Sequence, residues 1–280
     1  MLVDKPAGPT SHDVVSRVRR ALGIRAVGHT GTLDPFATGL LVVLVGRATR
    51  LARFVEAQPK TYLARARLGQ RTETDDPTGA VVGPPLEWPE LPEAAVRDAL
   101  GGFAGIQRQR PPSYSAKHVA GERSYRLARR GESVPLPEAE VTVHGIALVE
   151  YRPPELTFRA TVSAGTYLRA LARDLGERLG TGAHLIALRR EAIGPLRVED
   201  AVPLDRIGPD AVRPARSVLG HLPAVDLDER ARTDVLHGRA VAAADQPTGA
   251  DVALLAGGEL IAVARATNGW LRPAVVLGAP

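Results

Sequence analysis

The sequence predicts an α+β protein with a mixed, largely antiparallel sheet, flanking helices and a small β-rich region at the C-terminus. Segments with helical spacing and segments with strand-like alternation are mixed without a regular strand–helix–strand rhythm. The 280 residues are 44% hydrophobic, enough to bury the core of one large domain and one small domain. Because a proline-rich stretch spans 202–223, we expect the domains to cover 1–220 and 221–280.

The first 101 residues predict two helices and two strands. Ser11 is expected to cap a helix with a regular apolar face, which Gly23 ends. The run 40–45 is apolar throughout, as in a strand buried on both faces. Apolar and basic residues alternate over 61–68, which is typical of a strand with one buried face. A proline at the start and Gly101 just after the end indicate a short helix over 92–100.

The later elements follow from the same patterns. Two strands are expected at 141–149 and 156–162, on either side of a Pro-Pro turn. Leucines at helical spacing predict a helix over 168–179. A Gly-Gly turn predicts a hairpin over 252–263, and 273–277 is expected to add a strand.

Composition excludes several classes of protein. The chain has no cysteine, so disulfide frameworks, thiolate zinc sites and cysteine nucleophiles are excluded. We find no glycine-rich phosphate loop and no His-x-x-x-His pattern, and therefore expect no metal and no cofactor. No signal pattern and no apolar run of membrane-spanning length is present, so a cytoplasmic protein that does not bind membranes is expected.

Positive charge is concentrated in one part of the chain. The net charge is +5, and the stretch 107–131 has seven basic residues against one acidic residue. A local basic stripe is typical of a surface that binds a phosphate backbone, although a solvated helix over 124–130 would also explain part of it. The stretch 221–280 has five arginines against seven acidic residues, so it is not expected to bind RNA strongly. The candidate RNA-binding residues in the stripe are Arg108, Arg110, Lys117, Arg123 and Arg126.

The densest motif is Gly28-His29-Thr30-Gly31-Thr32-Leu33-Asp34-Pro35, followed by Ala37-Thr38-Gly39. Two glycines and a proline indicate a tight, irregular loop before the buried strand. This loop presents Asp34 between an apolar residue and a rigid one. By itself Asp34 could equally be an ordinary turn residue, since aspartate is common before proline in turns.

This motif resembles the catalytic motif of the bacterial TruB family, the tRNA pseudouridine(55) synthases. The resemblance covers about residues 2–200 and continues through several blocks in the same order. These blocks are Leu2-Val3-Asp4-Lys5-Pro6, Lys60-Thr61-Tyr62, Asp75-Asp76 with Gly79, Pro111-Pro112-Ser113-Tyr114-Ser115-Ala116, Gly165-Thr166-Tyr167-Leu168-Arg169, Gly182-Ala183-His184-Leu185 and Leu188-Arg189-Arg190.

The resemblance implies a pseudouridine synthase-like catalytic domain that isomerises a flipped-out uridine in the tRNA T-loop without a cofactor. It implies that Asp34 is the catalytic carboxylate, that Arg169 is its partner and that Tyr62 stacks on the target base. The implied substrate-binding residues are His29, Tyr62, Tyr167 and Leu188. A solvated surface position is the plainer reading of Arg169.

Other implications of the resemblance concern RNA binding. The basic segment at about 105–135 is expected to clasp the RNA, and Lys5 and Asp76 are weaker candidates for RNA contacts. The pair Asp75-Asp76 could also suggest a metal, but acidic residues on a surface turn are the simpler reading. The C-terminal region is expected to be PUA-like and, given its acidic balance, to add little to binding of the T-arm.

Alternative functions remain at this point. A related enzyme could act on another RNA or within a guide-RNA complex, and an RNA-folding factor could have incidental isomerase activity. The complete set of Asp34, Tyr62 and Arg169 favours an active enzyme. We expect tRNA as the partner, no obligatory protein partner and a monomer.

Overall fold

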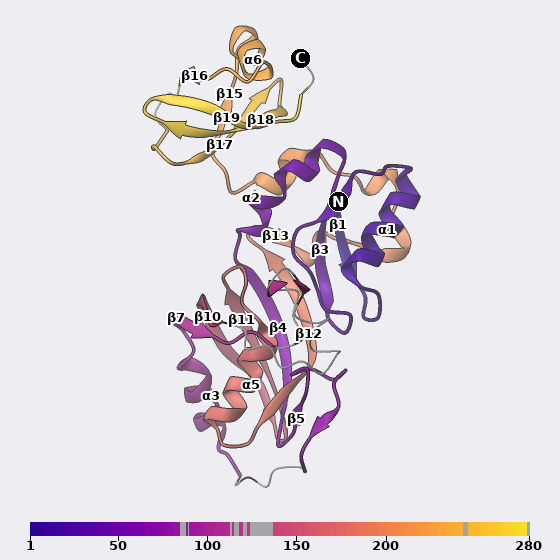
Figure 1. The fold of residues 1–280 in the computed structure, drawn as a ribbon, viewed down its shortest axis with the longest axis vertical. Helices are drawn as coiled ribbons and strands as arrows, with labels where there is room; N and C mark the ends of the chain where they lie inside the picture. Colours follow the sequence, from indigo (N-terminus) through magenta and orange to yellow (C-terminus); the bar gives the residue numbers. More distant parts are fainter. Residues whose placement is uncertain are drawn as a thin grey trace.

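The computed structural model describes residues 1–84, 88, 90–112, 114, 118–119, 122–123, 137–242 and 246–278, with only the backbone at 118–119 and 122–123. Its main feature is a ten-stranded mixed sheet (Figure 1). The strands of this sheet are β1 (Leu2–Lys5), β2 (Val27–His29), β3 (Thr38–Val45), β4 (Lys60–Leu68), β7 (Gly105–Gln109), β10 (Ala139–Arg152), β11 (Glu155–Val162), β12 (Ala183–Ile193), β13 (Leu196–Arg197) and β14 (Val202–Pro203).

The large sheet is mostly antiparallel, as predicted. Its main path runs β14-β1-β3-β12-β4-β11-β10-β7, with β2 on β3 and β13 on β12. Parallel pairing occurs between β1 and β14 and between β3 and β12. The β3–β12 contact is only two residue pairs long, so the sheet has a narrow parallel seam at Thr38 and Gly39.

Helices α3 (Glu93–Gly101) and α5 (Leu168–Arg178) pack on strands β4, β10 and β11 (Figure 1). Side chains of both helices share one hydrophobic cluster with these strands. Strand β4 alternates between buried and exposed side chains over most of its length, which confirms the pattern predicted over 61–68. Strands β10 and β11 extend beyond the predicted ranges and flank the Pro153-Pro154 turn.

Helix α1 (Ser11–Leu22) begins one residue away from the predicted cap. Thr10 is the N-cap and forms a capping box with Asp13, whereas Ser11 is buried. The predicted cap at Ser11 is therefore wrong, and its hydroxyl has another use described below. Gly23 ends the helix in the left-handed conformation, as predicted.

The C-terminal region forms a second, five-stranded sheet in the order β15-β17-β18-β19-β16. The predicted hairpin corresponds to β17 and β18, and the region also contains helix α6, which the sequence patterns did not reveal. Its elements are β15 (Ala224–Asp226), α6 (Glu229–Leu236), β16 (Val241–Ala242), β17 (Asp251–Ala256), β18 (Glu259–Thr267) and β19 (Trp270–Val276). The domain boundary expected at 220–221 stays a prediction.

The second sheet shares a hydrophobic cluster with the first part of the chain. Val263 and Val275 belong to the same cluster as Leu51 and Phe54. At the same junction, Arg50 donates a 2.7 Å hydrogen bond to the carbonyl of Val276. The two sheets are therefore joined by packing as well as by the chain.

The remaining elements are short. They are α2 (Ala52–Glu56), β5 (Arg71–Thr72), β6 (Val81–Val82), β8 (His118–Val119), β9 (Glu122–Arg123), and the 3-10 helices Gly46–Leu51, Val198–Asp200, Leu204–Arg206, Pro209–Ala211 and Ala215–Leu219. The described part of the chain contains no helix that is long and apolar enough to cross a membrane.

Candidate active site

Buried side chains fix the backbone of the loop that carries Asp34. The Ser11 hydroxyl accepts a 2.8 Å hydrogen bond from the Leu33 amide and donates one of 3.1 Å to the Leu33 carbonyl. The Lys5 ammonium is fully buried and donates to the carbonyls of Pro35 at 3.3 Å and Ala37 at 2.7 Å. Because both neighbours of Asp34 are fixed in this way, the direction of its side chain is set by the backbone.

Arg190 fixes the other end of this loop at the β3–β12 seam. Its guanidinium is buried and donates to the carbonyls of Leu40 at 2.7 Å and Gly31 at 3.1 Å. Gly39 has a φ of 102°, and a Cβ atom there would lie 2.3 Å from the Arg190 carbonyl oxygen. Only glycine permits this close approach of the two strands.

Arg169 pairs with Asp34 through both carboxylate oxygens. Its Nε lies 2.9 Å from Oδ2, and its Nη2 donates to Oδ1 over 3.3 Å. The Arg169 side chain is 6% exposed, whereas that of Asp34 is 33% exposed. The solvated-surface reading of Arg169 is therefore wrong. A planar guanidinium holds a carboxylate in a fixed direction, and here the carboxylate remains open to a substrate.

Asp76 is a second acidic partner of the same arginine. Its Oδ2 lies 3.4 Å from Arg169 Nη1, and its Oδ1 accepts hydrogen bonds from Thr74 and Thr78. Asp76 is 4% exposed, so the reading as an acidic residue on a surface turn is wrong, while the expected RNA contact stays a prediction. Arg169 is therefore held between two carboxylates. Their negative charges offset the unfavourable interaction between this cation and the positive end of the helix dipole in the first turn of α5.

The protonation of Asp34 depends on this balance of burial and charge. Burial raises the pKa of Asp34 above its usual value, and the nearby Asp76 raises this pKa further. The Arg169 guanidinium opposes the shift by favouring the carboxylate. Burial also lowers the pKa of Lys5 to about 8, although Asp34 favours its charged form.

An apolar wall adjoins the loop. Tyr62 and Leu188 are buried on β4 and β12 and share a hydrophobic cluster with Leu33 and Ala37. Tyr167 precedes α5, and its amide donates a 2.8 Å hydrogen bond to the Gln109 side chain. The structure thus brings Tyr62 and Leu188 to the loop that carries Asp34, while their contacts with a base stay predictions.

His29 is the last residue of β2 and directly precedes the loop. It is half-buried, and burial together with the charges of Arg190 and His12 lowers its pKa. Its Nδ1 is buried and forms no hydrogen bond with any described residue. These observations favour a neutral imidazole beside the loop, and the predicted insertion next to a flipped nucleotide stays a prediction.

The structure separates the predicted RNA-binding residues into groups. Arg108 and Arg110 are exposed at the edge strand β7 and just after it. Lys5 is 0% exposed and donates to loop carbonyls, and its predicted RNA contact stays a prediction. Lys117 and Arg126 lie outside the described residues, and Arg123 is described by its backbone alone.

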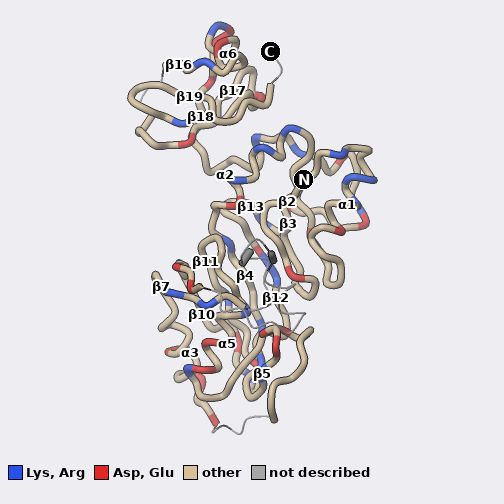
Figure 2. The backbone as a smooth tube through the Cα atoms, viewed as in Figure 1, with Lys and Arg blue, Asp and Glu red and all other residues tan. Residues whose placement is uncertain are grey.

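Sequence reasoning missed two kinds of residues. Thr74 and Thr78 bind Asp76, and the Thr-x-Asp-x-Thr spacing could have indicated a hydroxyl-supported turn. A second set of arginines lies along α1 and the stretch before α2, where Figure 2 shows blue segments. Over 17–53 seven arginines accompany one acidic residue, Asp34.

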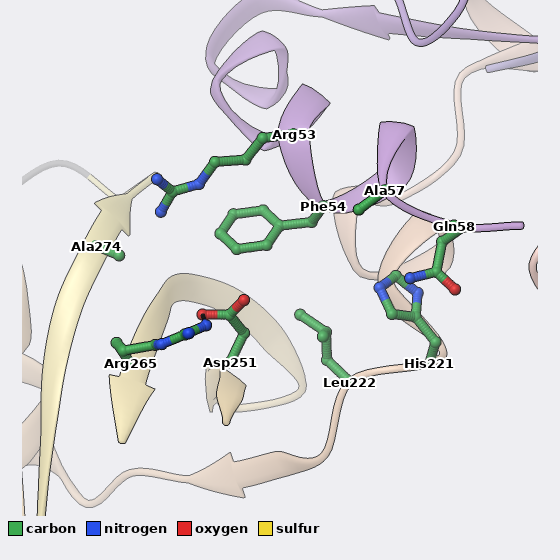
Figure 3. A pocket seen from close by; sticks show the side chains of 9 residues that line it. All are labelled: Arg53, Phe54, Ala57, Gln58, His221, Leu222, Asp251, Arg265 and Ala274. Atoms are coloured by element: carbon green, nitrogen blue, oxygen red, sulfur yellow. Dashed lines mark ion pairs between the residues drawn. The ribbon is translucent and has the colours of Figure 1, made fainter. Parts of the chain in front are cut away.

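A pocket lies away from Asp34. It has a volume of about 560 Å³ and lies between α2 and the second sheet, with Phe54 and His221 among its lining residues (Figure 3). It contains none of the predicted site residues. In the described ranges no three histidine or acidic side chains are grouped so as to hold a metal ion.

Comparisons with known proteins identify the family of this chain. Residues 19–168 match the TruB family pseudouridylate synthase (N terminal domain), and residues 169–215 match the tRNA pseudouridylate synthase B C-terminal domain. The tRNA pseudouridine synthase B of Thermobifida fusca is 45% identical over 99% of this chain and 97% of its own length. That of Burkholderia pseudomallei is 42% identical over 100% and 97%.

Solved structures give the same fold. A chain in the structure of an H/ACA RNP bound to a substrate RNA containing 2'-deoxyuridine has a TM-score of 0.76 at 25% identity, over 99% of this chain and 84% of that one. A chain of the archaeal box H/ACA sRNP Nop10-Cbf5 complex has a TM-score of 0.74 at 26% identity, over 99% and 85%. From the full-length identity to its relatives and the matched family domains, the chain belongs to the TruB family of tRNA pseudouridine synthases.

Proposed function

We propose that this enzyme converts uridine to pseudouridine at position 55 in the T-loop of tRNA, with Asp34 as the nucleophile or base. The observation that carries the proposal is the Asp34 carboxylate, fixed by both oxygens to a buried arginine yet 33% exposed. Arg169 fixes the orientation of this carboxylate and favours its ionised form, and the carboxylate remains accessible to a nucleotide.

The reaction needs only what this site contains. The bond between the ribose C1′ and the base N1 breaks, the base rotates, and C5 bonds to C1′. The proton on C5 leaves and N1 acquires one, so the isomerisation involves no net redox change and no cofactor. Asp34 can attack the sugar, add to the base or remove a ribose proton, and all three routes require its ionised form.

The neighbouring residues suit a base that has left its stack. A flipped base is commonly held against aromatic or apolar side chains. Tyr62 and Leu188 provide such a surface beside the loop, and we assign the stacking contact to Tyr62. The exposed Arg108 and Arg110 suit the phosphates of the bound RNA.

A second candidate function follows from the structural similarity to chains of H/ACA complexes. Under this alternative the chain would act on RNA presented by a guide and would need partner proteins. The full-length identity to tRNA pseudouridine synthases favours action on free tRNA instead. We therefore propose activity without an obligatory protein partner, as a monomer in the cytoplasm.

The test is to map pseudouridine in an unmodified tRNA transcript after incubation with the purified chain alone. We expect one modified position in the T-loop, and none in a transcript whose target uridine is replaced by cytidine. Turnover should persist in EDTA once the tRNA is folded. A product at another position would refute the assigned specificity, and RNA refolding without pseudouridine would favour the folding-factor alternative.

A further inference from the structure

Helix α5 carries a second, partly buried arginine, Arg173, one turn after Arg169. Residues four apart lie on the same face of a helix, so both side chains point toward the turn that contains Asp75 and Asp76. Arg173 Nη1 lies 3.1 Å from Asp75 Oδ2, and its Nε donates to Asp174 over 2.9 Å. The side chains of Arg173 and Asp75 are both 15% exposed.

The two arginines make parallel sets of contacts. Arg169 binds Asp76 and Arg173 binds Asp75, so consecutive acidic residues meet consecutive turns of one helix. Each arginine also holds the backbone at the start of the basic segment. Arg169 Nη2 donates to the Tyr114 carbonyl at 3.0 Å, and Arg173 Nη2 donates to the Arg110 carbonyl at 2.9 Å.

The backbone of Asp75 explains why its side chain needs an anchor. Asp75 has a φ of 57°, in the left-handed region that non-glycine residues rarely adopt. Its amide donates to Thr72 at 3.2 Å, and its carbonyl accepts from Leu185 at 3.1 Å. Such a conformation persists only where the surroundings hold it. The next residue is Asp76, so a change at Asp75 rotates the carboxylate that contacts Arg169.

The ionisation of Asp75 also depends on Arg173. Burial raises the pKa of Asp75 to about 6, while Arg173 and Arg169 favour its carboxylate and Asp174 disfavours it. Without Arg173, Asp75 would keep its burial and lose its closest cation. Its ionised form would then be poorly compensated, and the left-handed turn would lose its side-chain tether.

We propose that Arg173 is a positioning residue that, through Asp75, sets the geometry of the Asp76–Arg169–Asp34 network and joins it to the start of the basic segment. The inference rests on the proposed function of Asp34. Arg173 does not contact Asp34. Its side chain fixes both the turn that contains Asp75 and the backbone of Arg110. RNA contacts near residue 110 and the position of the catalytic carboxylate therefore depend on the same arginine.

The experiment compares Arg173→Ala, Arg173→Lys, Asp75→Asn and the double variant Asp75→Asn/Arg173→Ala. Arg178→Ala is the matched control, because Arg178 is on the same helix but donates to the Ala99 carbonyl, away from the site. Each variant is measured for the single-turnover rate at saturating tRNA, the dissociation constant for tRNA, and the melting temperature. These readouts separate a loss of positioning from a loss of binding or of folding.

We expect Arg173→Ala and Asp75→Asn each to lower the saturated rate about tenfold, and the double variant to be no slower than the slower single variant, since both act through one contact. Lysine should restore part of the rate, because it can pair with Asp75 without the second reach to the Arg110 carbonyl. The control should keep the wild-type rate.

Other results would contradict either the positioning role of Arg173 or the proposed function. A rate for Arg173→Ala within about twofold of wild type, or two losses that multiply in the double variant, would overturn the positioning role. If Arg173→Ala does not fold, the near-isosteric Asp75→Asn and the charge-preserving Arg173→Lys decide the question by the same rate criterion. A wild-type chain that modifies no tRNA would instead overturn the proposed function itself.

Discussion

The loop that carries Asp34 has buried cations on two sides, and their partners differ. On the side of α5, Arg169 meets the carboxylates of Asp34 and Asp76 in addition to the carbonyls of Thr74 and Tyr114. On the side of β1 and β12, Lys5 and Arg190 make their described hydrogen bonds to backbone carbonyls. A cation on a carboxylate changes protonation and reactivity, whereas a cation on carbonyls fixes the path of the chain. The first side therefore acts directly on the Asp34 carboxylate, whereas the second mainly fixes the loop, although Lys5 also lowers the pKa of Asp34 through its charge.

The largest expected effect comes from removing the anion itself. Asp34→Asn keeps the shape of the side chain and one oxygen that can accept from Arg169, but it loses the charge, the second acceptor and the nucleophile. We expect no detectable pseudouridine and nearly normal tRNA affinity, measured by tritium release and filter binding. Asp4→Asn is a suitable control, since Asp4 pairs with Arg189 outside the Asp34 network. Turnover by Asp34→Asn, after deamidation back to aspartate is excluded by mass spectrometry, would reject the assigned chemistry.

Arg169→Ala tests the side that acts directly on the Asp34 carboxylate. Loss of one preorganised charge at a reacting group typically slows turnover by about 10²–10³-fold, and we expect a loss in that range. Arg169 favours the ionised form of Asp34, so its removal should raise the Asp34 pKa further and move the acid-side fall in rate to higher pH. Arg169→Lys should recover part of the rate.

The pH dependence of the saturated rate, measured for the wild type and both variants, checks this ordering. An Arg169→Ala enzyme with the wild-type rate and an unmoved acid limb would leave Asp34 in place and remove its dependence on the pairing. Circular dichroism should show that the fold is retained, because the partly exposed Asp34 can reach water without its partner.

Lys5→Met tests the opposite side. Its carbonyl partners lose their donor, and an unsatisfied buried acceptor typically costs about 1–3 kcal/mol of unfolding free energy. Removal of a buried charge offsets part of this cost, so we expect a net loss of about 2 kcal/mol in urea unfolding. The saturated rate of the folded variant should change only a few-fold. If Lys5→Met had normal stability and a rate as low as that of Arg169→Ala, the proposed difference between the roles of Lys5 and Arg169 would be wrong.

The smallest effect concerns the exposed arginines. If Arg108 and Arg110 contact phosphates, each contact contributes about −0.9 to the slope of log affinity against log salt on a duplex, and about −0.7 on a single strand. Arg108→Gln/Arg110→Gln should flatten this slope and leave the modified position unchanged. An equal pair of substitutions at Arg230 and Arg232 in the acidic C-terminal region serves as the control. An unaltered slope would show that the two arginines are merely solvated.

The sequence predicted local elements well and long-range pairs poorly. The alternation in β4 and the glycine stop of α1 were readable because a few neighbouring residues determine them. The burial of Arg169 was not readable without the family resemblance, because its partners are 135 and 95 residues away. Ser11 shows the same limit. Its position next to a helix start suggested a cap, but its hydroxyl is used by Leu33.

The shared cluster around Phe54 and Val275 also bears on the modularity of this chain. Leu219 and Val263 lie in that cluster with residues from the first 55 positions, so the apolar side chains on both sides of residue 221 cover one another. Deleting everything after that residue would expose a broad apolar surface, and the remainder would be prone to self-association. A single protease nick at the exposed Gly220, by contrast, would leave the two pieces held together, so they should co-purify as a complementing pair of fragments. The C-terminal sheet is thus an integral part of the enzyme's architecture and not a detachable accessory.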